Sequence, residues 1–289
     1  NSHNIRYCLM LTTDKVPLWW SEISDQDIQS AYKSLNSRQL SQGNVVSQFE
    51  EQFSNIEYAM YGVATTSCTT ALQLAGITAG IKHGDEVIIP NRTWIATAHA
   101  FKWIGAELKV CPVSEDNMLI DINAARKLIT TKTKAIVPVS LNGRNVITKD
   151  LVDLASDNNI WIIEDAAQGI FAPRPYEYIE HSNVNYCRTY SFSMAKFITS
   201  GQGGMILTND RSFSEELRDR RTHGLSNIRR VCDWKKLGSN FRMSDVLASI
   251  ALNQLNNIES RKEKHLINYD FYNRNLNRDI VRIIPSQIS

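Results

Sequence analysis

From residue 61 onward, short apolar runs alternate with stretches of helical periodicity. The apolar runs predict strands, and the stretches whose apolar positions recur every three or four residues predict helices. Strands are predicted at 61–66, 85–90, 107–113, 134–141, 160–166, 186–193 and 203–210, and helices at 69–80, 96–105, 122–129 and 148–158. Unbroken apolar strands between helices indicate an α/β fold with a largely parallel sheet covered on both faces. In such folds ligands bind in the loops at the carboxyl ends of the strands.

Two further helices are predicted ahead of the first strand. Residues 24–35 carry apolar positions at helical spacing behind Ser24 and Asp27, a pair typical of a capping box. Residues 45–56 show a similar pattern. Each segment therefore predicts an amphipathic helix.

The last part of the chain is more basic and more helical. It predicts a helix at 212–224, a long helix from 244 to 276 and a strand at 279–285. We therefore expect a large domain over 15–240 and the start of a smaller C-terminal domain over 241–289, which looks incomplete. Because the chain opens without a methionine, we also expect it to be a fragment.

Composition narrows the function classes. Across 289 residues the net charge is +2, with 43% hydrophobic and 21% charged residues, which argues against a nucleic-acid-binding protein. No apolar run approaches the roughly 20 residues that a bilayer requires, so no membrane partner is expected. The cysteines lack the paired spacing of a metal site or disulfide framework, which favours a reducing, cytoplasmic location and no metal: Cys8, Cys68, Cys111, Cys187 and Cys232.

The first loop with unusual chemistry is "TTSCTTAL", residues 65–72, where a predicted strand gives way to a helix. Backbone N–H groups at a helix N-terminus, with the positive end of the dipole behind them, can bind an anion. The hydroxylated residues here can equally be ordinary N-caps. Taken alone, the segment favours the cap.

The second loop is "IWIIEDAAQG", residues 160–169, which delivers Glu164 and Asp165 at the end of a buried strand and Gln168 shortly after. A buried carboxylate is unfavourable unless it meets a cation or strong donors. Asp165 is thus either a helix N-cap or the partner of a protonated heterocyclic nitrogen.

The third loop is "SFSMAKFITSGQGGMILTND", residues 191–210. Here Lys196 stands between an apolar stretch and several glycines, and Ser191 ends the predicted strand. Desolvation favours a neutral amine, which can attack a carbonyl to form a Schiff base. An exposed loop lysine is the simpler explanation, but it does not account for the neighbouring features.

An anion cradle, a strand-end carboxylate and an unusual lysine are together what pyridoxal 5′-phosphate (PLP) requires. The chain resembles the DegT/DnrJ/EryC1/StrS family of PLP-dependent sugar aminotransferases, with the aspartate-aminotransferase-like fold. The resemblance rests on segments in the family's order: "LSQG", "SCTTAL", "GDEVIIPNRTWIATAHA", "KAIVPVSLNG", "IEDAAQ", "SFSMAKFITSGQGGMILTND" and "GSNFRMSD".

The resemblance implies a role for each matching position. Lys196 is the catalytic Schiff-base lysine, and the cofactor-binding residues form a larger set: Cys68, Thr69, Trp94, Asp165, Gln168, Ser191 and Asn240. Cys68, Thr69 and Ser191 would hold the phosphate, and Asp165 would pair with the ring nitrogen. Gln168 would contact the phenolic oxygen, while Trp94 would stack on the ring unless it is an ordinary core aromatic. Asn240 would reach the site of a neighbouring subunit, which implies a homodimer.

The implied reaction moves an amino group, most simply from glutamate, to a keto group of a nucleotide-linked deoxysugar for surface polysaccharide or glycoside synthesis. Cyclitol amination and a catalytically inactive PLP-binding relative are the alternatives, whereas the family's dehydrating branch replaces the lysine with histidine. The chain departs from the family at Ser140–Gly143, where an "HLYG"-like segment is usual. We also expect Arg174 or Tyr176 to alter the substrate side of the pocket.

Overall fold

A computed structural model describes residues 21–173, 176–225 and 236–284. At its centre lies a seven-stranded sheet with the order β1-β7-β6-β5-β4-β2-β3. Its strands are β1 (Tyr61–Thr65), β2 (Glu86–Pro90), β3 (Glu107–Cys111), β4 (Thr133–Ile136), β5 (Trp161–Asp165), β6 (Tyr186–Ser191) and β7 (Gly204–Thr208). Only β7 runs antiparallel to its neighbours β1 and β6. The other six strands therefore point the same way, and their carboxyl ends share one edge of the sheet.

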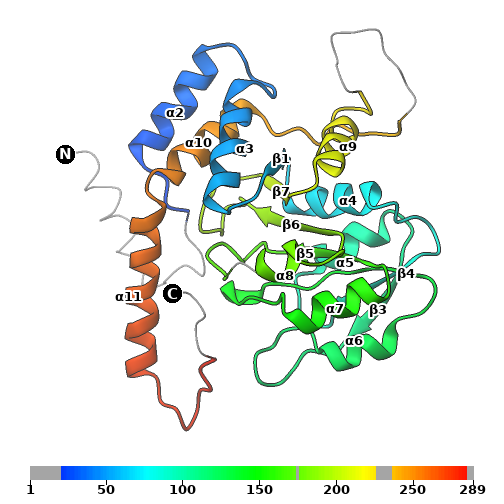
Figure 1. Ribbon diagram of the computed structural model, residues 1–289. Coiled ribbons are helices and arrows are strands. Elements are labelled where there is room, and N and C mark those ends of the chain that lie inside the picture. Colours follow the sequence, from blue (N-terminus) through cyan, green and yellow to red (C-terminus); the bar gives the residue numbers. More distant parts are fainter. Residues whose placement is uncertain (1–20, 174–175, 226–235, 285–289) are drawn as a thin grey trace.

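Helices cover both faces of this sheet (Figure 1). The helices that pack on it or extend from it are α2 (Asp25–Asn36), α3 (Asn44–Ile56), α4 (Cys68–Thr78), α5 (Ile95–Lys102), α6 (Ile122–Leu128), α7 (Lys149–Asp157), α8 (Tyr176–Glu180), α9 (Arg211–Arg221), α10 (Asp245–Leu255) and α11 (Ile258–Asn275), with a 3-10 turn η1 (Leu141–Gly143). One core joins α4, α5 and α9 to the sheet. On the opposite face, α3 and α10 pack over β1, β6 and β7, while α6 and α7 pack over β2, β4 and β5.

Alternation along each strand explains these layers. In β1, Val63 belongs to the core under α4, whereas its neighbour Ala64 belongs to the core under α3. In β5, Ile163 belongs to the core under α4, and its neighbour Ile162 belongs to the core under α6 and α7. Successive strand side chains point to opposite faces, so a strand buried on both faces has a nearly continuous apolar sequence. The predicted α/β architecture with a mostly parallel, doubly covered sheet is confirmed.

Two predictions for the C-terminal part are wrong. The helix predicted as one unit from 244 to 276 is two helices, because the chain turns at Asn256 and Asn257 between α10 and α11. Residues 279–284 form no strand. A strand needs a neighbour for its hydrogen bonds, and Ile280 is instead exposed to solvent. The proposed division near residue 240 stays a prediction.

Helix α2 packs on the rest of the protein through a different side from the one that its sequence predicts. Its capping box is confirmed, since Ser24 and Asp27 each accept the other's backbone N–H. However, its apolar positions Ile28, Tyr32 and Leu35 are 51–58% exposed. The side that packs on α10 is polar: Asp27 is buried and accepts a hydrogen bond from Asn253 Nδ2 at 2.8 Å. The apolar stripe of α2 therefore faces outward.

Candidate active site

A cavity of about 970 Å³ opens at the carboxyl edge of the parallel strands. All but one of the predicted site residues line it: Cys68, Thr69, Trp94, Asp165, Gln168, Ser191 and Lys196. They follow the ends of β1, β2, β5 and β6, which are far apart in sequence. Helix α11 adds Lys262, His265 and Tyr269 to the wall. The sheet thus brings the three loops singled out in the sequence to one place.

The N-terminus of α4 faces this cavity. Ser67 caps the helix, and its side chain and that of Thr70 satisfy each other's backbone N–H groups. The next two N–H groups, of Cys68 and Thr69, have no acceptor within the described part of the chain. The N-cap interpretation is confirmed for Ser67. The anion site stays a prediction, and the two N–H groups beside the cap are the donors that it requires.

Gly204 keeps this helix end in position. A Cβ atom at Gly204 would lie 2.4 Å from the carbonyl carbon and oxygen of Ser67 and 2.6 Å from the nitrogen of Cys68. The first residue of β7 is thus in contact with the backbone of the capping turn. Only glycine permits this close approach without moving the free N–H groups.

Asp165 ends β5 as a buried carboxylate in the cavity wall, 5% exposed. Its Oδ2 accepts a hydrogen bond from Thr97 Oγ1 at 2.7 Å, and its Oδ1 accepts one from the Ala167 N–H at 3.0 Å. Among the described residues it forms no ion pair. Burial raises its pKa, although the hydroxyl, the N–H and the charge of Lys196 oppose that shift. No helix begins here, so the N-cap alternative is wrong: Asp165 closes a turn.

Thr97 connects Asp165 to the loop after β2. The single hydroxyl hydrogen of Thr97 is donated to Asp165, so the Thr93 hydroxyl must donate to Thr97 across 2.6 Å. Thr97 is fully buried in the first turn of α5. The motif that contains Trp94 therefore also orients the carboxylate, a role that the sequence pattern did not indicate.

Lys196 lies half-buried in the loop between β6 and β7. Its backbone N–H donates to Ser193 O at 3.0 Å, which forms a turn just after the end of β6. Phe197 beside it packs edge-on against Phe171, and its carbonyl oxygen accepts a hydrogen bond from Arg261 of α11. The loop that carries Lys196 is therefore held by contacts with Phe171 and with Arg261.

The segment that departs from the family pattern contacts the predicted site directly. The Asn142 N–H donates to Gln168 Oε1 at 2.9 Å, with Asn142 held at a φ of 53°. Ser140 Oγ donates to the buried carboxylate of Glu164. The segment Ser140–Gly143 therefore orients Gln168 and contacts Glu164, the residue before Asp165.

Trp94 and Asn240 lie at the periphery. Trp94 is 77% exposed at the N-cap position of α5, so its interpretation as a core aromatic is wrong. Asn240 is exposed and accepts a hydrogen bond from Arg242 Nε at 2.9 Å, and it does not line the cavity that holds Lys196. Arg174 and the side chain of Tyr176 lie outside the described residues.

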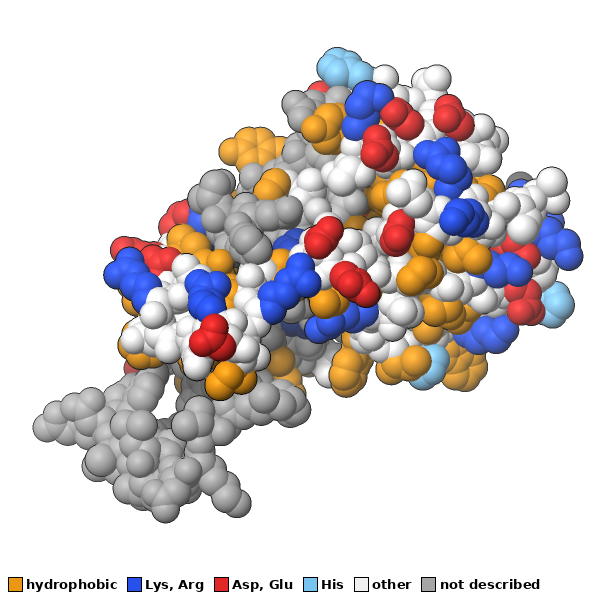
Figure 2. Space-filling view, turned by 90° about the horizontal axis from the view of Figure 1, so that it is seen from below, with side chains coloured by type: hydrophobic (Ala, Val, Ile, Leu, Met, Phe, Trp, Pro, Cys, Tyr) orange, Lys and Arg blue, Asp and Glu red, His pale blue; other side chains and the backbone are white. Residues whose placement is uncertain are grey.

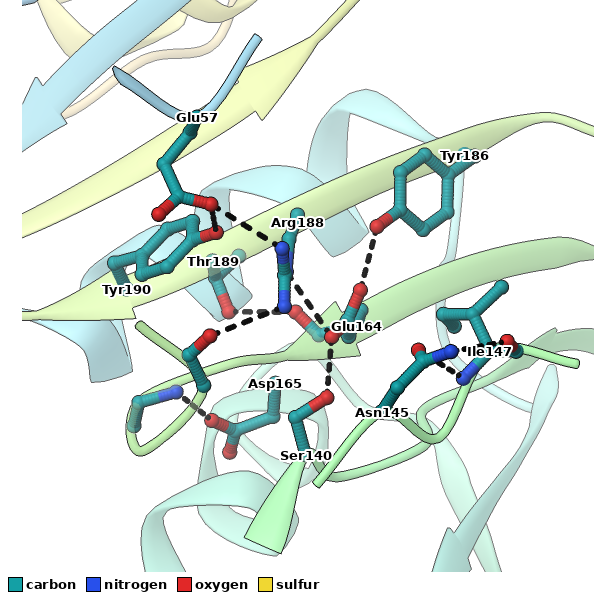
Figure 3. Close-up of polar contacts among 12 residues, drawn as sticks. Glu57, Ser140, Asn145, Ile147, Glu164, Asp165, Tyr186, Arg188, Thr189 and Tyr190 are labelled. Atoms are coloured by element: carbon teal, nitrogen blue, oxygen red, sulfur yellow. Dashed lines mark hydrogen bonds and ion pairs between the residues drawn. The ribbon is translucent and has the colours of Figure 1, made fainter. Parts of the chain in front are cut away.

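Behind the cavity lies a buried ionic cluster (Figure 3). Arg188 of β6 pairs with Glu164 at 3.1 Å and with Glu57 at 3.3 Å, and its Nη2 donates to a backbone carbonyl oxygen. Tyr186 donates to Glu164, and Tyr190 donates to Glu57. Burial by itself would lower the pKa of Arg188, but its anionic and phenolic neighbours raise it well above the usual value.

This cluster positions the end of β5 and was not found from the sequence. Glu57 lies in the turn after α3, more than 130 residues from Arg188. Contacts between such distant residues leave no local periodicity. The single available signal was the adjacent Glu164–Asp165 pair at the end of an apolar strand, because two buried carboxylates require partners.

The donor set fits PLP. A buried carboxylate without a cationic partner matches a protonated ring nitrogen, and the free N–H groups of Cys68 and Thr69 match a phosphate. Lys196 lines the same cavity and is close enough to Asp165 to influence its pKa. The residues present therefore satisfy the three demands of this cofactor.

The chain is similar to known proteins over most of its length. The chain is 30% identical over 264 residues to a GDP-perosamine synthase of Escherichia coli O157:H7, covering 91% of this chain and 71% of that protein. It is 36% identical over 222 residues to a GDP-perosamine synthase of Caulobacter vibrioides, covering 75% of this chain and 58% of that one.

Among solved structures, 3-amino-5-hydroxybenzoic acid synthase matches with a TM-score of 0.77 and 27% identity over 85% of this chain and 65% of its own. An aminotransferase from Psychrobacter cryohalolentis matches with a TM-score of 0.74 and 28% identity over 84% of this chain and 63% of its own. The chain thus spans about 58–71% of these proteins. The sequence profile of the DegT/DnrJ/EryC1/StrS aminotransferases matches residues 21–286, and the chain belongs to this family.

Proposed function

We propose that this protein transfers an amino group from an amino-acid donor, glutamate in the simplest case, to a keto group of a nucleotide-linked deoxysugar. PLP is the cofactor of the family. The observation that carries the proposal is the convergence of Lys196 and Asp165 on one cavity with a helix N-terminus. The names of the two curated relatives, both GDP-perosamine synthases, support a nucleotide sugar as the acceptor.

Each residue has a proposed role that follows from its contacts. When bound, PLP supplies an electron-accepting ring that stabilises negative charge at the donor carbon. Asp165 keeps the ring nitrogen protonated, because a buried carboxylate next to an N–H⁺ favours the charged pair. Lys196 holds the cofactor and moves protons through its Nζ. The N–H groups of Cys68 and Thr69, with the Ser191 hydroxyl, bind the phosphate.

Gln168 and Trp94 complete the proposed pocket. Gln168 is oriented by the Asn142 N–H, so its amide nitrogen can donate toward the ring oxygen. Trp94, exposed at the cavity mouth, can cover one face of a ring and exclude water from it. Because Lys196 stands where the dehydrating branch has histidine, amino transfer is favoured over dehydration.

The proposed assembly is a homodimer. The outward stripe of α2, made of Ile28, Tyr32 and Leu35, is an apolar face of the kind that subunits bury. Asn240 is exposed and away from its own cavity, as expected of a residue that serves a neighbouring site. The same chain would then supply one residue to its partner's pocket.

A cytoplasmic location is proposed on the basis of cysteine chemistry. Cys68, Cys111 and Cys187 are buried and unpaired, which is typical of a reducing compartment. Within the described ranges, no helix has the length and apolar character needed to cross a bilayer.

Spectroscopy and product analysis test the proposal. Purified protein incubated with PLP should absorb in the near-visible, and addition of glutamate should bleach that band as the amino group moves to the cofactor. Adding a 4-keto or 3-keto nucleotide deoxysugar should restore it with formation of an amino sugar. A band that ignores every amino-acid donor would instead favour a binding-only relative, and restoration by a keto-cyclitol alone would favour cyclitol amination.

A further inference from the structure

Arg144, just after η1, is a buried cation that has no counter-charge among the described residues. It is 8% exposed and lines the cavity. Its Nη1 donates to Leu141 O at 3.2 Å, and no carboxylate among the described residues pairs with it. Burial, followed by repulsion from Arg92, lowers its pKa, but a guanidinium remains charged at neutral pH. A buried charge in this state is unfavourable unless an anion arrives.

The other buried arginines show that this fold supplies carboxylates where it needs them. Three arginines are buried in the described part: Arg144, Arg188 and Arg221. Arg188 pairs with Glu57 and Glu164, and Arg221 pairs with Glu50. Arg144 is the exception, and it is also the one of the three that lines the cavity. An anionic ligand in the cavity can therefore reach Arg144.

The position of Arg144 separates it from the proposed phosphate site. It follows β4, whereas the N-terminus of α4 follows β1, four strands away in the sheet. At about 4.8 Å between neighbouring strands, the two strands lie about 19 Å apart. Asp165, at the end of β5, lies between them. The proposed site for the cofactor phosphate, at the N-terminus of α4, is therefore separate from Arg144.

Arg92 strengthens the positive potential on this side. It follows β2, the neighbour of β4, and it is close enough to Arg144 to lower the pKa of that guanidinium. Arg92 is itself exposed, and its Nη1 contacts Met118 Sδ at 3.2 Å. Within the described ranges neither guanidinium pairs with a carboxylate, so the two groups at adjacent strand ends form a site for an oxyanion. A planar guanidinium can bind such a group through two parallel hydrogen bonds.

We propose that Arg144 binds an anionic oxygen group of a substrate, and so acts as a specificity-determining residue of the site. The inference rests on the proposed function, because that function brings two anionic substrates to the cavity. The shared chemistry is a carboxylate of the amino donor or a phosphate of the nucleotide sugar. Both present paired oxygens to the planar guanidinium, whereas a neutral ligand would leave the charge uncompensated.

Direct binding separates the two sources. Isothermal titration calorimetry of the PLP-loaded protein would use glutarate as the carboxylate probe and GDP and UDP as the phosphate probes. Arg144→Gln should weaken one class of probe by about tenfold or more, because it removes charged hydrogen bonds to the ligand; tenfold corresponds to about 1.4 kcal/mol. The affinity of Arg144→Lys for that probe should lie between those of wild type and Arg144→Gln, because lysine keeps the charge but lacks the paired donors. Arg126→Gln, on the exposed surface of α6, is the matched control and should bind as wild type.

Each outcome decides the matter. Weaker glutarate binding alone assigns Arg144 to the donor, and weaker nucleotide binding alone assigns it to the acceptor. Equal affinities of wild type and Arg144→Gln for all probes, or no binding of any probe by wild type, would overturn the inference. Retained cofactor absorbance and an unchanged thermal midpoint show that the variant is folded. Bleaching of the wild-type band by glutamate tests the proposed function separately, so the two failures are distinguishable.

Discussion

Replacing Arg188 with methionine removes the centre of the buried cluster in Figure 3. The side chains of Glu57 and Glu164 are both fully buried, and Arg188 is the cation that pairs with each of them. Methionine fills much of the same volume without a charge. The substitution therefore removes the guanidinium from two carboxylates that stay inside the protein.

The expected loss is large. Removing one partner of a buried ion pair costs about 3–5 kcal/mol, because the remaining charge is desolvated and uncompensated. Unfolding free energies of domains are typically about 5–15 kcal/mol, so this is a substantial fraction of the total. Two carboxylates are affected here, and the backbone hydrogen bond of Arg188 Nη2 is also lost. We therefore expect at least about 3 kcal/mol.

Urea unfolding followed by circular dichroism measures this loss as a shift of the midpoint at constant slope. Arg211→Met is the matched control: Arg211 pairs with Glu215 on the exposed surface of α9, where solvent screens the pair, so its midpoint should stay close to that of wild type. The triple variant E57Q/E164Q/R188M should recover at least half of the loss, since it removes the unpaired charges. A loss below about 1 kcal/mol in Arg188→Met would refute the reasoning.

Two further predictions concern the edge of the sheet, and a third concerns the contact between α3 and α10. Gly204→Ala places a Cβ atom 2.4 Å from the Ser67 carbonyl, so we expect a loss of about 1–3 kcal/mol and weaker PLP binding, and an unchanged titration would count against the close packing. Burial raises the pKa of Asp165, so in the cofactor-free protein this carboxyl keeps its proton above about pH 4, where it ionises in the unfolded chain; its contribution to stability should fall as pH rises from there through the raised pKa. Asp165→Asn should lack that part of the slope in urea midpoints from pH 4 to 8, and parallel profiles would contradict it. Asp245 accepts hydrogen bonds from the N–H groups of Gly43 and Val46 at 2.8 and 3.0 Å, so Asp245→Ala should cost about 2 kcal/mol by thermal or urea unfolding, and an unchanged midpoint would contradict this role.

Local features of the fold were predictable because they depend on neighbouring residues. The apolar runs located every strand of the sheet, and Ser24 with Asp27 marked the start of α2. The three loops were also found, since strand ends in a parallel sheet meet at one edge. The five-residue helix α8 gave no such signal, because it is too short for a full helical period to repeat.

Long-range features were not predictable. The apolar stripe of α2 looked like a core face, but Asn253 and Gln254 of α10 bind its polar side instead. Nothing near Arg144 in sequence shows that it is buried without a carboxylate, since that depends on the packing of the loops after β2 and β4. Thr97 illustrates the same point within the site: its spacing from Trp94 is ordinary, and only the fold aims it at Asp165.

The central claim is that Lys196 carries the cofactor. Reduction of the PLP-loaded protein with borohydride fixes the cofactor to the lysine that it is bonded to, and peptide mass mapping then locates the label. The account predicts one label, on the peptide that contains Lys196. A label on Lys262, the other lysine of the cavity wall, or no stable label at all would contradict it.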